Sequence, residues 1–466
     1  MRASLASSIA VTCAAVLALP VSLAAPAAAT APPAVAALPP GPEQLPGSTQ
    51  SLPLEALDGS VRGFGGTGAD PAERGLARRD VRPFSLVGVV WDDPAAALHG
   101  SVQVRTRATG GGTWSEWQDV ETHNDEHGAD PETAEGAARA LKGSTAPLWV
   151  GDSDGVEIRV RGEEQLPDGL RLELVDPGAE PAGAAPGARA AAVPAGPSAA
   201  EAAASSVNSQ LAPYGAGWIP ALSKEETEVS FHHFPPAAKA AQAARPPQVA
   251  PAKAASVAAA AAKPYIGPRP KIITRKGWGA DEKLREKGFV YTKSIKAAFV
   301  HHTATGNNYT CSQAPSVLRG IYRYHVKSSG WRDFGYNFAV DKCGNIYEGR
   351  AGGVAKPVLG AHTLGFNTNS MGVAVIGTYS KSNPPAAVLT AVAKLTAWKL
   401  GLHGVNPTST TYLTSGGGNL YKKGTKVKLR TISGHRDGFA TECPGARLYG
   451  KLATARTSSA KYQGRL

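Results

Sequence analysis

Alternation of apolar and polar residues with a period of two characterises the chain between residues 80 and 177. In the segment 101–107, Val and Thr at the even positions alternate with Ser, Gln and Arg at the odd positions. A strand with one buried face produces this pattern. Comparable strands, separated by Gly-containing turns, are predicted at 84–91, 113–117, 148–150, 156–161 and 170–175. These features predict an all-β, sandwich-like accessory domain over residues 80–177.

The pattern changes between residues 264 and 466, where apolar runs alternate with segments of helical periodicity. Apolar residues recur every three or four positions at 314–325 and 388–398, which predicts two amphipathic helices. Short apolar runs that predict strands occupy 295–300, 334–340, 346–348, 371–376 and 429–432. Strands and helices in alternation, without a Gly-rich phosphate loop, predict an α/β domain whose mixed β-sheet is flanked by helices.

The remaining segments have compositions that disfavour a packed core. Residues 1–29 combine a positively charged start, an apolar run from Ile9 to Leu23 and small residues at the end, as in a cleaved signal peptide. The run is shorter than the roughly 20 residues that span a bilayer, so we expect no stable membrane anchor. We predict a disordered arm at 30–79 and an Ala/Pro-rich linker at 178–263. Within the linker, Leu211–Phe234 contains aromatic residues that would let it dock on a domain.

Charge is distributed unevenly along the chain. From Lys263 to the end there are 31 Lys and Arg against 8 Asp and Glu, a net charge of +23, whereas the whole chain carries +12. So basic a domain favours an anionic partner, either nucleic acid or an anionic cell-wall polymer. Nucleic acid is disfavoured because the chain shows neither a recognition-helix signature nor an aromatic RNA-binding motif.

Cysteine usage points to one loop near the end of the chain. Cys13 would leave with the signal peptide. Exported thiols tend to pair, and Cys311 and Cys343 flank a compact segment, which makes them candidates for a disulfide. Cys443 would then be single, in a Gly- and Pro-punctuated loop that begins at Gly434 and His435.

Two histidines complete a candidate metal site with this cysteine. His301 and His435 each follow directly on an apolar run, so both are expected at strand ends, where a sheet can hold a ligand rigidly. Together with Cys443 they make up the three protein ligands of a catalytic zinc site, which keeps a fourth position open. The alternative is a pair of core histidines and a buried thiol, and the spacing of the residues does not decide between the two.

Other histidines and aromatic residues have plainer interpretations. His123 and His127 lie in an acidic, Gly-bearing loop and are expected to be solvated, whereas His302 and His325 are expected to pack beside the site or in the core. Four tryptophans of the β region would form either a sugar-binding platform or, as we favour, core and sheet-face packing. They are Trp91, Trp114, Trp117 and Trp149.

Several short motifs occur in a characteristic order in the C-terminal part of the chain. They are R-K-G-W-G-A at 275–280, F-V-H-H-T at 299–303, Y-R-Y-H at 322–325, G-W-R-D-F-G-Y-N-F at 330–338, Y-E-G-R at 347–350, G-A-H-T-L-G-F-N at 360–367 and G-H-R-D through C-P-G at 434–445. Together they closely resemble the peptidoglycan recognition protein family, which shares a fold with type 2 N-acetylmuramoyl-L-alanine amidases. The resemblance covers about Ile272 to Tyr449. The layout of residues 80–177 is similar to the β-rich N-terminal region of actinobacterial relatives.

The resemblance implies one zinc ion, bound by His301, His435 and Cys443. Many members of the family lack the cysteine and only bind their ligand, so its presence here favours catalysis. Tyr336 matches the family's catalytic tyrosine, whose phenol can donate a hydrogen bond to a developing oxyanion or orient the zinc-bound water. Thr441 matches a position that supports the transition state, where phage relatives have a lysine, and we expect it to have a minor catalytic role.

The resemblance also implies substrate contacts. Trp331 with its preceding glycine, together with Arg350, accompanies a preference for diaminopimelate-type stem peptides in the family. The Arg350 guanidinium would form a two-pronged pair with the extra carboxylate of that residue, the alternative being a structural role. His362 matches a position in the substrate groove.

The function implied is that of a secreted, cell-wall-associated, zinc-dependent N-acetylmuramoyl-L-alanine amidase. It would hydrolyse the amide between the lactyl group of N-acetylmuramic acid and L-alanine in peptidoglycan, by attack of zinc-bound water. Peptidoglycan and anionic wall polymers are the expected partners. The alternative function is that of a non-catalytic peptidoglycan-binding protein of the cell wall, and a nucleic-acid binder is the remaining, disfavoured one.

Overall fold

The computed structural model describes residues 47–57, 73–124, 126–138, 140–163, 165–180, 197–233 and 265–465. These residues belong to one unit that spans Gln44–Leu466. The predicted signal peptide at 1–29 lies outside the described residues. Among the residues that are described, none of the helices combines the length and the apolar character needed to cross a membrane.

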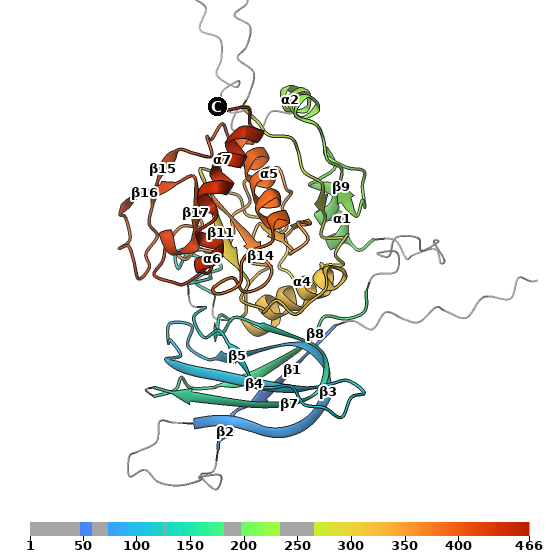
Figure 1. Ribbon diagram of the computed structural model, residues 1–466, viewed down its shortest axis with the longest axis vertical. Coiled ribbons are helices and arrows are strands. Elements are labelled where there is room, and N and C mark those ends of the chain that lie inside the picture. Colours follow the sequence, from blue (N-terminus) through green and yellow to red (C-terminus); the bar gives the residue numbers. More distant parts are fainter. Residues whose placement is uncertain are drawn as a thin grey trace, which may run out of the picture. The chain divides into compact units, whose positions relative to one another are not determined.

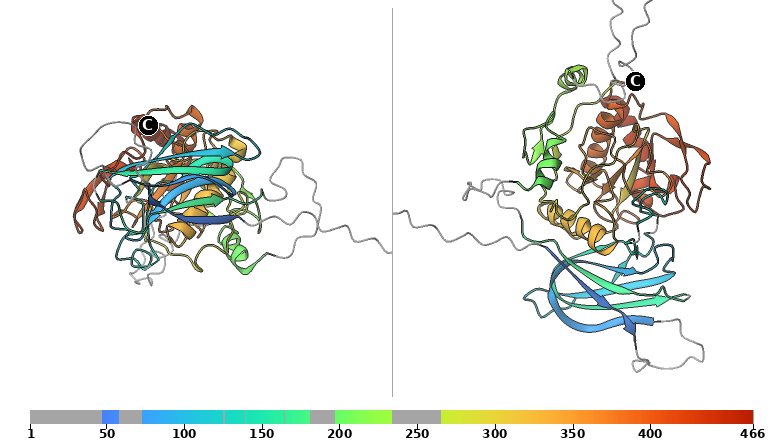
Figure 2. Two further views of the ribbon diagram at one scale, coloured as in Figure 1. Left: turned by 90° about the horizontal axis from the view of Figure 1, so that it is seen from below. Right: turned by 180° about the vertical axis from the view of Figure 1, so that it is seen from behind.

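The N-terminal part forms an antiparallel β-sheet. Within the described residues it has eight strands, six of them in the order β1-β8-β3-β7-β4-β5, with β2 and β6 paired to β3. They are β1 (Ser48–Pro53), β2 (Glu55–Ala56), β3 (Glu73–Trp91), β4 (Gly100–Ala108), β5 (Gln118–Val120), β6 (Gly143–Ser144), β7 (Leu148–Gly162) and β8 (Arg171–Asp176). Figure 2 shows long, twisted strands, with β3 curving along its length. Val87, Val104, Ile158 and Leu172 are buried in its core. The all-β prediction is confirmed.

The sheet begins earlier in the chain than predicted. Strands β1, β2 and the start of β3 lie within 30–79, so the prediction of a disordered arm is wrong for these residues. β1 pairs with β8 from Ser48↔Asp176 to Pro53↔Arg171, a partner more than a hundred residues away. The strands predicted at 148–150 and 156–161, which we expected a Gly-containing turn to separate, form one continuous strand, β7, because this strand pairs with β3 on one side and β4 on the other.

Two of the four tryptophans of this domain pack in the core, as we favoured. Trp91 and Trp149 are buried in apolar clusters. Trp117 lies on the sheet face between two guanidinium groups, with Arg105 at 4.7 Å and Arg159 at 4.2 Å from the ring centroid. Cation–π contacts of this kind stabilise exposed sheet faces.

The C-terminal part contains a mixed sheet flanked by helices, as predicted. In the described part of the chain its strand order is β17-β11-β14-β12-β13-β10-β9. β11 is parallel to both β14 and β17, whereas β12 and β13 are antiparallel. The strands are β9 (Trp218–Ile219), β10 (Ile272–Ile273), β11 (Ala297–His302), β12 (Phe338–Val340), β13 (Ile346–Glu348), β14 (Ser370–Val375) and β17 (Ile432–Gly434). A separate hairpin is formed by β15 (Thr410–Thr414) and β16 (Lys426–Arg430), so the strand predicted at 429–432 is divided between β16 and β17.

Helices cover both faces of this sheet. α5 (Ala386–Leu402) and α7 (Leu452–Tyr462) lie side by side (Figure 1) and share one apolar core with Val300, Val373 and Ile432 of the sheet. On the other face, α4 (Ala314–Arg323) continues into a π-helical turn at Tyr324–Ser328. The remaining helical segments are α1 (Ala199–Ser206), α2 (Lys224–His233), α6 (Ala446–Tyr449) and the 3₁₀ turns Cys311–Gln313 and His435–Asp437.

Part of the predicted linker is folded against the C-terminal domain. Residues 197–233 include α1, β9 and α2, so the prediction of a linker is wrong for this segment. β9 pairs with β10, and the fully buried Ile219 joins the main core, which confirms the expected docking. Asn208 also donates its side-chain amide to the buried Glu348 carboxylate at 2.9 Å.

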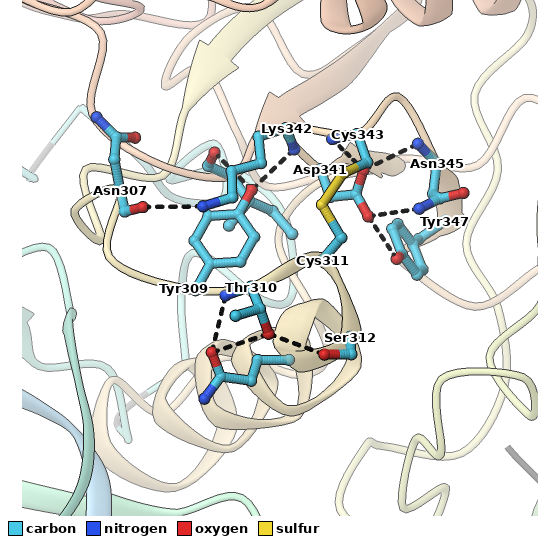
Figure 3. Close-up of a disulfide and its surroundings, with 12 residues drawn as sticks. Asn307, Tyr309, Thr310, Cys311, Ser312, Asp341, Lys342, Cys343, Asn345 and Tyr347 are labelled. Atoms are coloured by element: carbon cyan, nitrogen blue, oxygen red, sulfur yellow. Dashed lines mark hydrogen bonds between the residues drawn. A yellow bond between two sulfur atoms is a disulfide. The ribbon is translucent and has the colours of Figure 1, made fainter. Parts of the chain in front are cut away.

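A disulfide joins Cys311 to Cys343, as predicted (Figure 3). It ties the start of α4 to the turn between β12 and β13. Around it, Tyr347 donates its phenol to Asp341 at 2.8 Å, and the Lys342 backbone N–H donates to the Tyr309 oxygen at 2.8 Å. The bridge therefore fixes a hydrogen-bonded corner at one side of the sheet.

Candidate metal centre

Two parallel strands bring His301 and His435 together. In the register of β11 and β17, Val300 lies opposite Gly434, and the residue that follows each of them in the chain is a histidine. The ring centroids of the two histidines are 4.5 Å apart, and both side chains are fully buried. The prediction that both histidines lie at strand ends is confirmed. His435 begins the turn directly after β17, and His301 is the penultimate residue of β11.

The loop after His435 returns Cys443 to the same place. The Arg436 backbone N–H donates to the Cys443 carbonyl at 3.0 Å, and the Cys443 N–H donates to the Thr441 hydroxyl at 3.1 Å. These bonds hold the sulfur 3.8 Å from Nδ1 of His301. Among the described residues Cys443 is the free cysteine, and it is buried.

A fourth residue of the cluster was not foreseen. His127, which we expected to be solvated, has a side chain only 7% exposed and places Nε2 4.0 Å from the Cys443 sulfur. The four potential donor atoms of His127, His301, His435 and Cys443 all lie within 4.8 Å of one another. His127 belongs to the segment between β5 and β6 of the N-terminal domain, and no local pattern in that segment indicates a ligand.

The chemistry of this cluster fits a zinc ion. Within the described part of the chain, both ring nitrogens of His435 and Nδ1 of His127 are buried without a hydrogen-bond partner, an arrangement that costs free energy unless another group compensates it. Zinc with bonds of about 2.0–2.3 Å holds its donors roughly 3.3–3.8 Å apart. Here Nδ1 of His301 lies 3.8 Å from the Cys443 sulfur, and all four donor atoms lie within 4.8 Å of one another. Soft sulfur and imidazole nitrogen are the donors that zinc prefers.

Burial sets the protonation of the cluster. Desolvation, followed by neighbouring histidines, lowers the pKa values of His301 and His435 well below the ordinary range, so their nitrogen lone pairs are free. Desolvation likewise lowers the pKa of His127 to about 3. Burial raises the pKa of the Cys443 thiol. A bound divalent cation reverses this effect on a thiol, so metal uptake would release a proton from Cys443.

Tyr336 and Thr441, to which the resemblance assigns catalytic roles, lie beside this cluster. Tyr336 is 4% exposed, and its ring centroid is 5.2 Å from that of His301. Burial, followed by the nearby Cys443 and Glu126, raises the pKa of Tyr336, so its phenol remains a proton donor. The Thr441 hydroxyl donates to the Glu126 carboxylate at 2.7 Å. Both residues line a pocket together with His127, His302 and Cys443.

The predicted substrate residues are close to the centre but covered. Trp331 is 6% exposed and stacks on His325, with centroids 4.3 Å apart. His362 is fully buried behind His301, with ring centroids 5.3 Å apart, so it offers no surface to a ligand in this conformation. Arg350 is 5% exposed, and its partner is a carboxylate of the chain itself, Glu135.

The remaining histidine predictions are confirmed. Nδ1 of His302 accepts the Tyr379 backbone N–H at 3.1 Å, and the His302 carbonyl lies 3.9 Å from the Cys443 sulfur. Nδ1 of His325 accepts the Gly335 N–H at 3.3 Å within the core. Neither belongs to the group of donor atoms.

Comparison with known proteins agrees with this arrangement. Residues 291–446 match the N-acetylmuramoyl-L-alanine amidase family, and residues 33–198 match the family described as Rv3811 N-terminal galactose-binding domain-like. Peptidoglycan-recognition protein SC2 of Drosophila melanogaster is 29% identical over 185 residues, which cover 39% of this chain and 85% of that protein. The N-acetylmuramoyl-L-alanine amidase of Homo sapiens is 30% identical over 192 residues, which cover 40% of this chain and 28% of that protein.

A solved structure is similar to the same region. Peptidoglycan recognition protein-LE in complex with tracheal cytotoxin, a monomeric diaminopimelic acid-type peptidoglycan, is 29% identical and covers 39% of this chain and 92% of that chain, with a TM-score of 0.32. The C-terminal domain combines a mixed sheet with a buried His/His/Cys group that resembles the metal site of zinc amidases. The C-terminal part of the chain is a domain of the N-acetylmuramoyl-L-alanine amidase and peptidoglycan-recognition family, and it follows an Rv3811-like N-terminal domain.

Proposed function

We propose that the protein is an exported, zinc-dependent N-acetylmuramoyl-L-alanine amidase that acts on peptidoglycan in the cell wall. The observation that carries the proposal is the convergence of His301, His435 and Cys443 on one buried point, with the phenol of Tyr336 beside it. The family match over 291–446 supplies the substrate class. The export signal expected at 1–29 and the +23 charge of the C-terminal part support action on an anionic wall.

Each residue of the site has its own role in the proposed reaction. Zinc at the cluster supplies Lewis-acid chemistry, which polarises a carbonyl and activates water. Tyr336 keeps its proton, so it can donate a hydrogen bond to the oxyanion that develops as the amide carbonyl is attacked. Thr441 orients the loop through its bond from the Cys443 N–H and has a minor catalytic role. Arg350 would pair with a carboxylate of the stem peptide, with Trp331 and His362 shaping the surrounding site.

The test is release of new amino termini. The full chain and its His127→Ala variant are incubated with peptidoglycan, with zinc and with a chelator, and free L-alanine amino termini are measured. The variant is included because His127 is the member of the cluster that comes from the N-terminal domain. We expect zinc-dependent release of L-alanine amino termini by the His127→Ala variant, whether or not the unaltered chain releases them. Binding to peptidoglycan without release from either protein would support the non-catalytic alternative.

A further inference from the structure

The segment 121–142 of the N-terminal domain has a charge opposite to that of the domain it contacts. It contains six Asp and Glu against one Arg and one Lys, whereas the chain from Lys263 onward carries +23. The segment lies between β5 and β6, and its described residues, 121–124, 126–138 and 140–142, form turns and bends without a helix or strand. Complementary charge favours its docking on the amidase domain.

At the metal centre, this segment lies directly against the candidate ligands. His127 lies 4.6 Å from His435 and 5.7 Å from Tyr336, measured between ring centroids. Next to it, Glu126 accepts the Thr441 hydroxyl through its carboxylate and the Leu364 N–H through its carbonyl. A catalytic zinc site has three protein donors and an open position, whereas four protein donors make a closed site. His127 therefore supplies the donor that closes this one.

At Arg350, the same segment supplies a carboxylate. The Glu135 oxygens accept Nη1 and Nη2 of Arg350 at 2.7 and 2.9 Å, and the Arg332 N–H donates to Glu135 at 3.2 Å. Arg350 and Glu135 are 5% and 8% exposed. This is the two-pronged geometry that a substrate carboxylate would adopt with an arginine.

Between these two points, further polar contacts hold the segment down. Asp130 accepts the Gly365 N–H and the Asn367 side-chain amide, both at 2.8 Å. The Asn367 amide also donates to the Gly128 carbonyl at 2.8 Å. These bonds are polar and charged, and a buried ion pair has a net free energy close to that of its solvated partners. A ligand that offers the same groups can therefore compete with the segment.

We infer that residues 121–142 are an internal substrate mimic that keeps the enzyme latent. In this state His127 completes the donor set of the metal centre, and Glu135 occupies the carboxylate site at Arg350. Peptidoglycan fragments with a free stem carboxylate displace the segment and open both positions. The inference rests on the proposed function for the identity of the ligand, but not for the contacts of the segment.

The first test measures whether the metal centre has an open coordination position, and it requires no hydrolysis of a substrate. Cobalt(II) replaces zinc in the full chain, and its visible spectrum is followed during titration with azide. We expect no change for the unaltered chain or for the control His99→Ala, an exposed histidine of the same domain. We expect azide to change the spectrum of His127→Ala, whose coordination is open. An equal response of the unaltered chain and His127→Ala overturns the inference, and failure of all proteins to bind cobalt overturns the metal site itself.

The second test measures whether Glu135 competes with a ligand for Arg350. Binding of a diaminopimelate-containing muramyl peptide to the metal-free proteins is measured by calorimetry. We expect Glu135→Gln to bind about tenfold more tightly than the unaltered chain, because the competing carboxylate is gone. Glu132→Gln is the matched control, since Glu132 belongs to the same segment but forms an exposed ion pair, with Lys423 of the C-terminal domain. Equal affinity of the unaltered chain and Glu135→Gln contradicts the inference.

A third measurement uses only the unaltered chain, so it does not depend on the folding of a variant. Hydrogen exchange of residues 126–138 is compared with and without saturating muramyl peptide. Faster exchange in the complex supports displacement, and unchanged exchange overturns it. If the segment is displaced but neither His127→Ala nor Glu135→Gln releases L-alanine amino termini from peptidoglycan, the amidase function fails and the mimicry by the segment stands.

Discussion

Arg350 holds the carboxylate of Glu135 through both of its terminal nitrogens, across a sequence separation of 215 residues. The pair joins the two domains of the chain and is buried on both sides. The resemblance assigns Arg350 to a substrate carboxylate, and in this structure the carboxylate of Glu135 occupies that position. This single contact links the N-terminal domain to the surroundings of the candidate metal centre.

The coupling between these two side chains is expected to be large. In a double-mutant cycle with Glu135→Gln and Arg350→Gln, we expect a coupling free energy of about 2–5 kcal/mol in urea unfolding, because either single change leaves a buried charge without its partner. The exposed pair Glu132–Lys423 is the matched control, with a coupling below about 1 kcal/mol. Additive effects of the two buried changes would contradict the observed contact.

Loss of Cys443 is expected to abolish zinc binding. Cys443→Ala removes the sulfur donor, so the purified variant should contain far less than one zinc per chain by atomic absorption and should lose amidase activity, while muramyl-peptide binding persists. Glu442→Gln, a change in the neighbouring exposed side chain, should retain the metal. A chelator should also lower the melting temperature of the unaltered chain but not that of Cys443→Ala, because bound metal stabilises only the folded state.

Tyr336→Phe is expected to separate catalysis from binding. The phenyl ring keeps the packing against His301 and Phe334, so stability and zinc content should stay unchanged. Loss of the donated hydrogen bond should reduce the rate constant of hydrolysis by about 10²–10³-fold, measured in the His127→Ala background where the site is open. A rate within about threefold of the parent would show that the phenol has no catalytic part.

Removal of the disulfide is expected to act on stability alone. Cys311→Ala with Cys343→Ala opens a loop of sequence separation 32, which should lower the free energy of unfolding by about 2–4 kcal/mol. Zinc content should be unaffected, since the bridge lies outside the donor cluster. Urea denaturation of the oxidised, reduced and doubly substituted proteins measures the effect. Identical curves for the three would contradict it.

Lys399 is expected to make stability rise with pH. Burial lowers its pKa to about 7, and its amine donates to the carbonyls of Val354 and Lys356, each at 2.6 Å. An unfolded lysine keeps its proton up to about pH 10.4. Between these values the unfolded state binds more protons, so the free energy of unfolding should rise with pH, by up to about 1.4 kcal/mol per unit. Lys399→Met should flatten this slope, whereas Lys394→Met, a change at a half-buried lysine of the same helix whose amine lies over the Tyr462 ring, should keep it.

Local pattern was enough to predict most elements of the C-terminal domain. The period of three to four at 314–325 and 388–398 corresponds to α4 with its π-helical turn and to α5. The apolar run before His301 corresponds to β11, whereas the run at 429–432 is divided between β16 and β17. These elements bury their own apolar side chains on the adjacent layer, so their sequences carry the signal directly.

Other elements depend on partners that are distant in the sequence. β1 alternates only weakly and contains Pro53, and it becomes a strand because β8 offers a free edge. The same is true of β9, a two-residue strand within an Ala- and Pro-rich region that pairs with β10. Composition suggested disorder around β1 and a linker around β9, because the stabilising contacts lie outside any local window.

The sequence by itself determined the set of groups that suits zinc, namely two histidines after apolar runs and one unpaired cysteine in a constrained loop. Parallel strands in register then carry His301 and His435 to neighbouring positions. Only the tertiary structure decided that His127 and Glu135 meet that site. They reach it through an irregular acidic segment of another domain, whose docking depends on shape and charge complementarity between surfaces, and such complementarity leaves no periodic trace in the sequence.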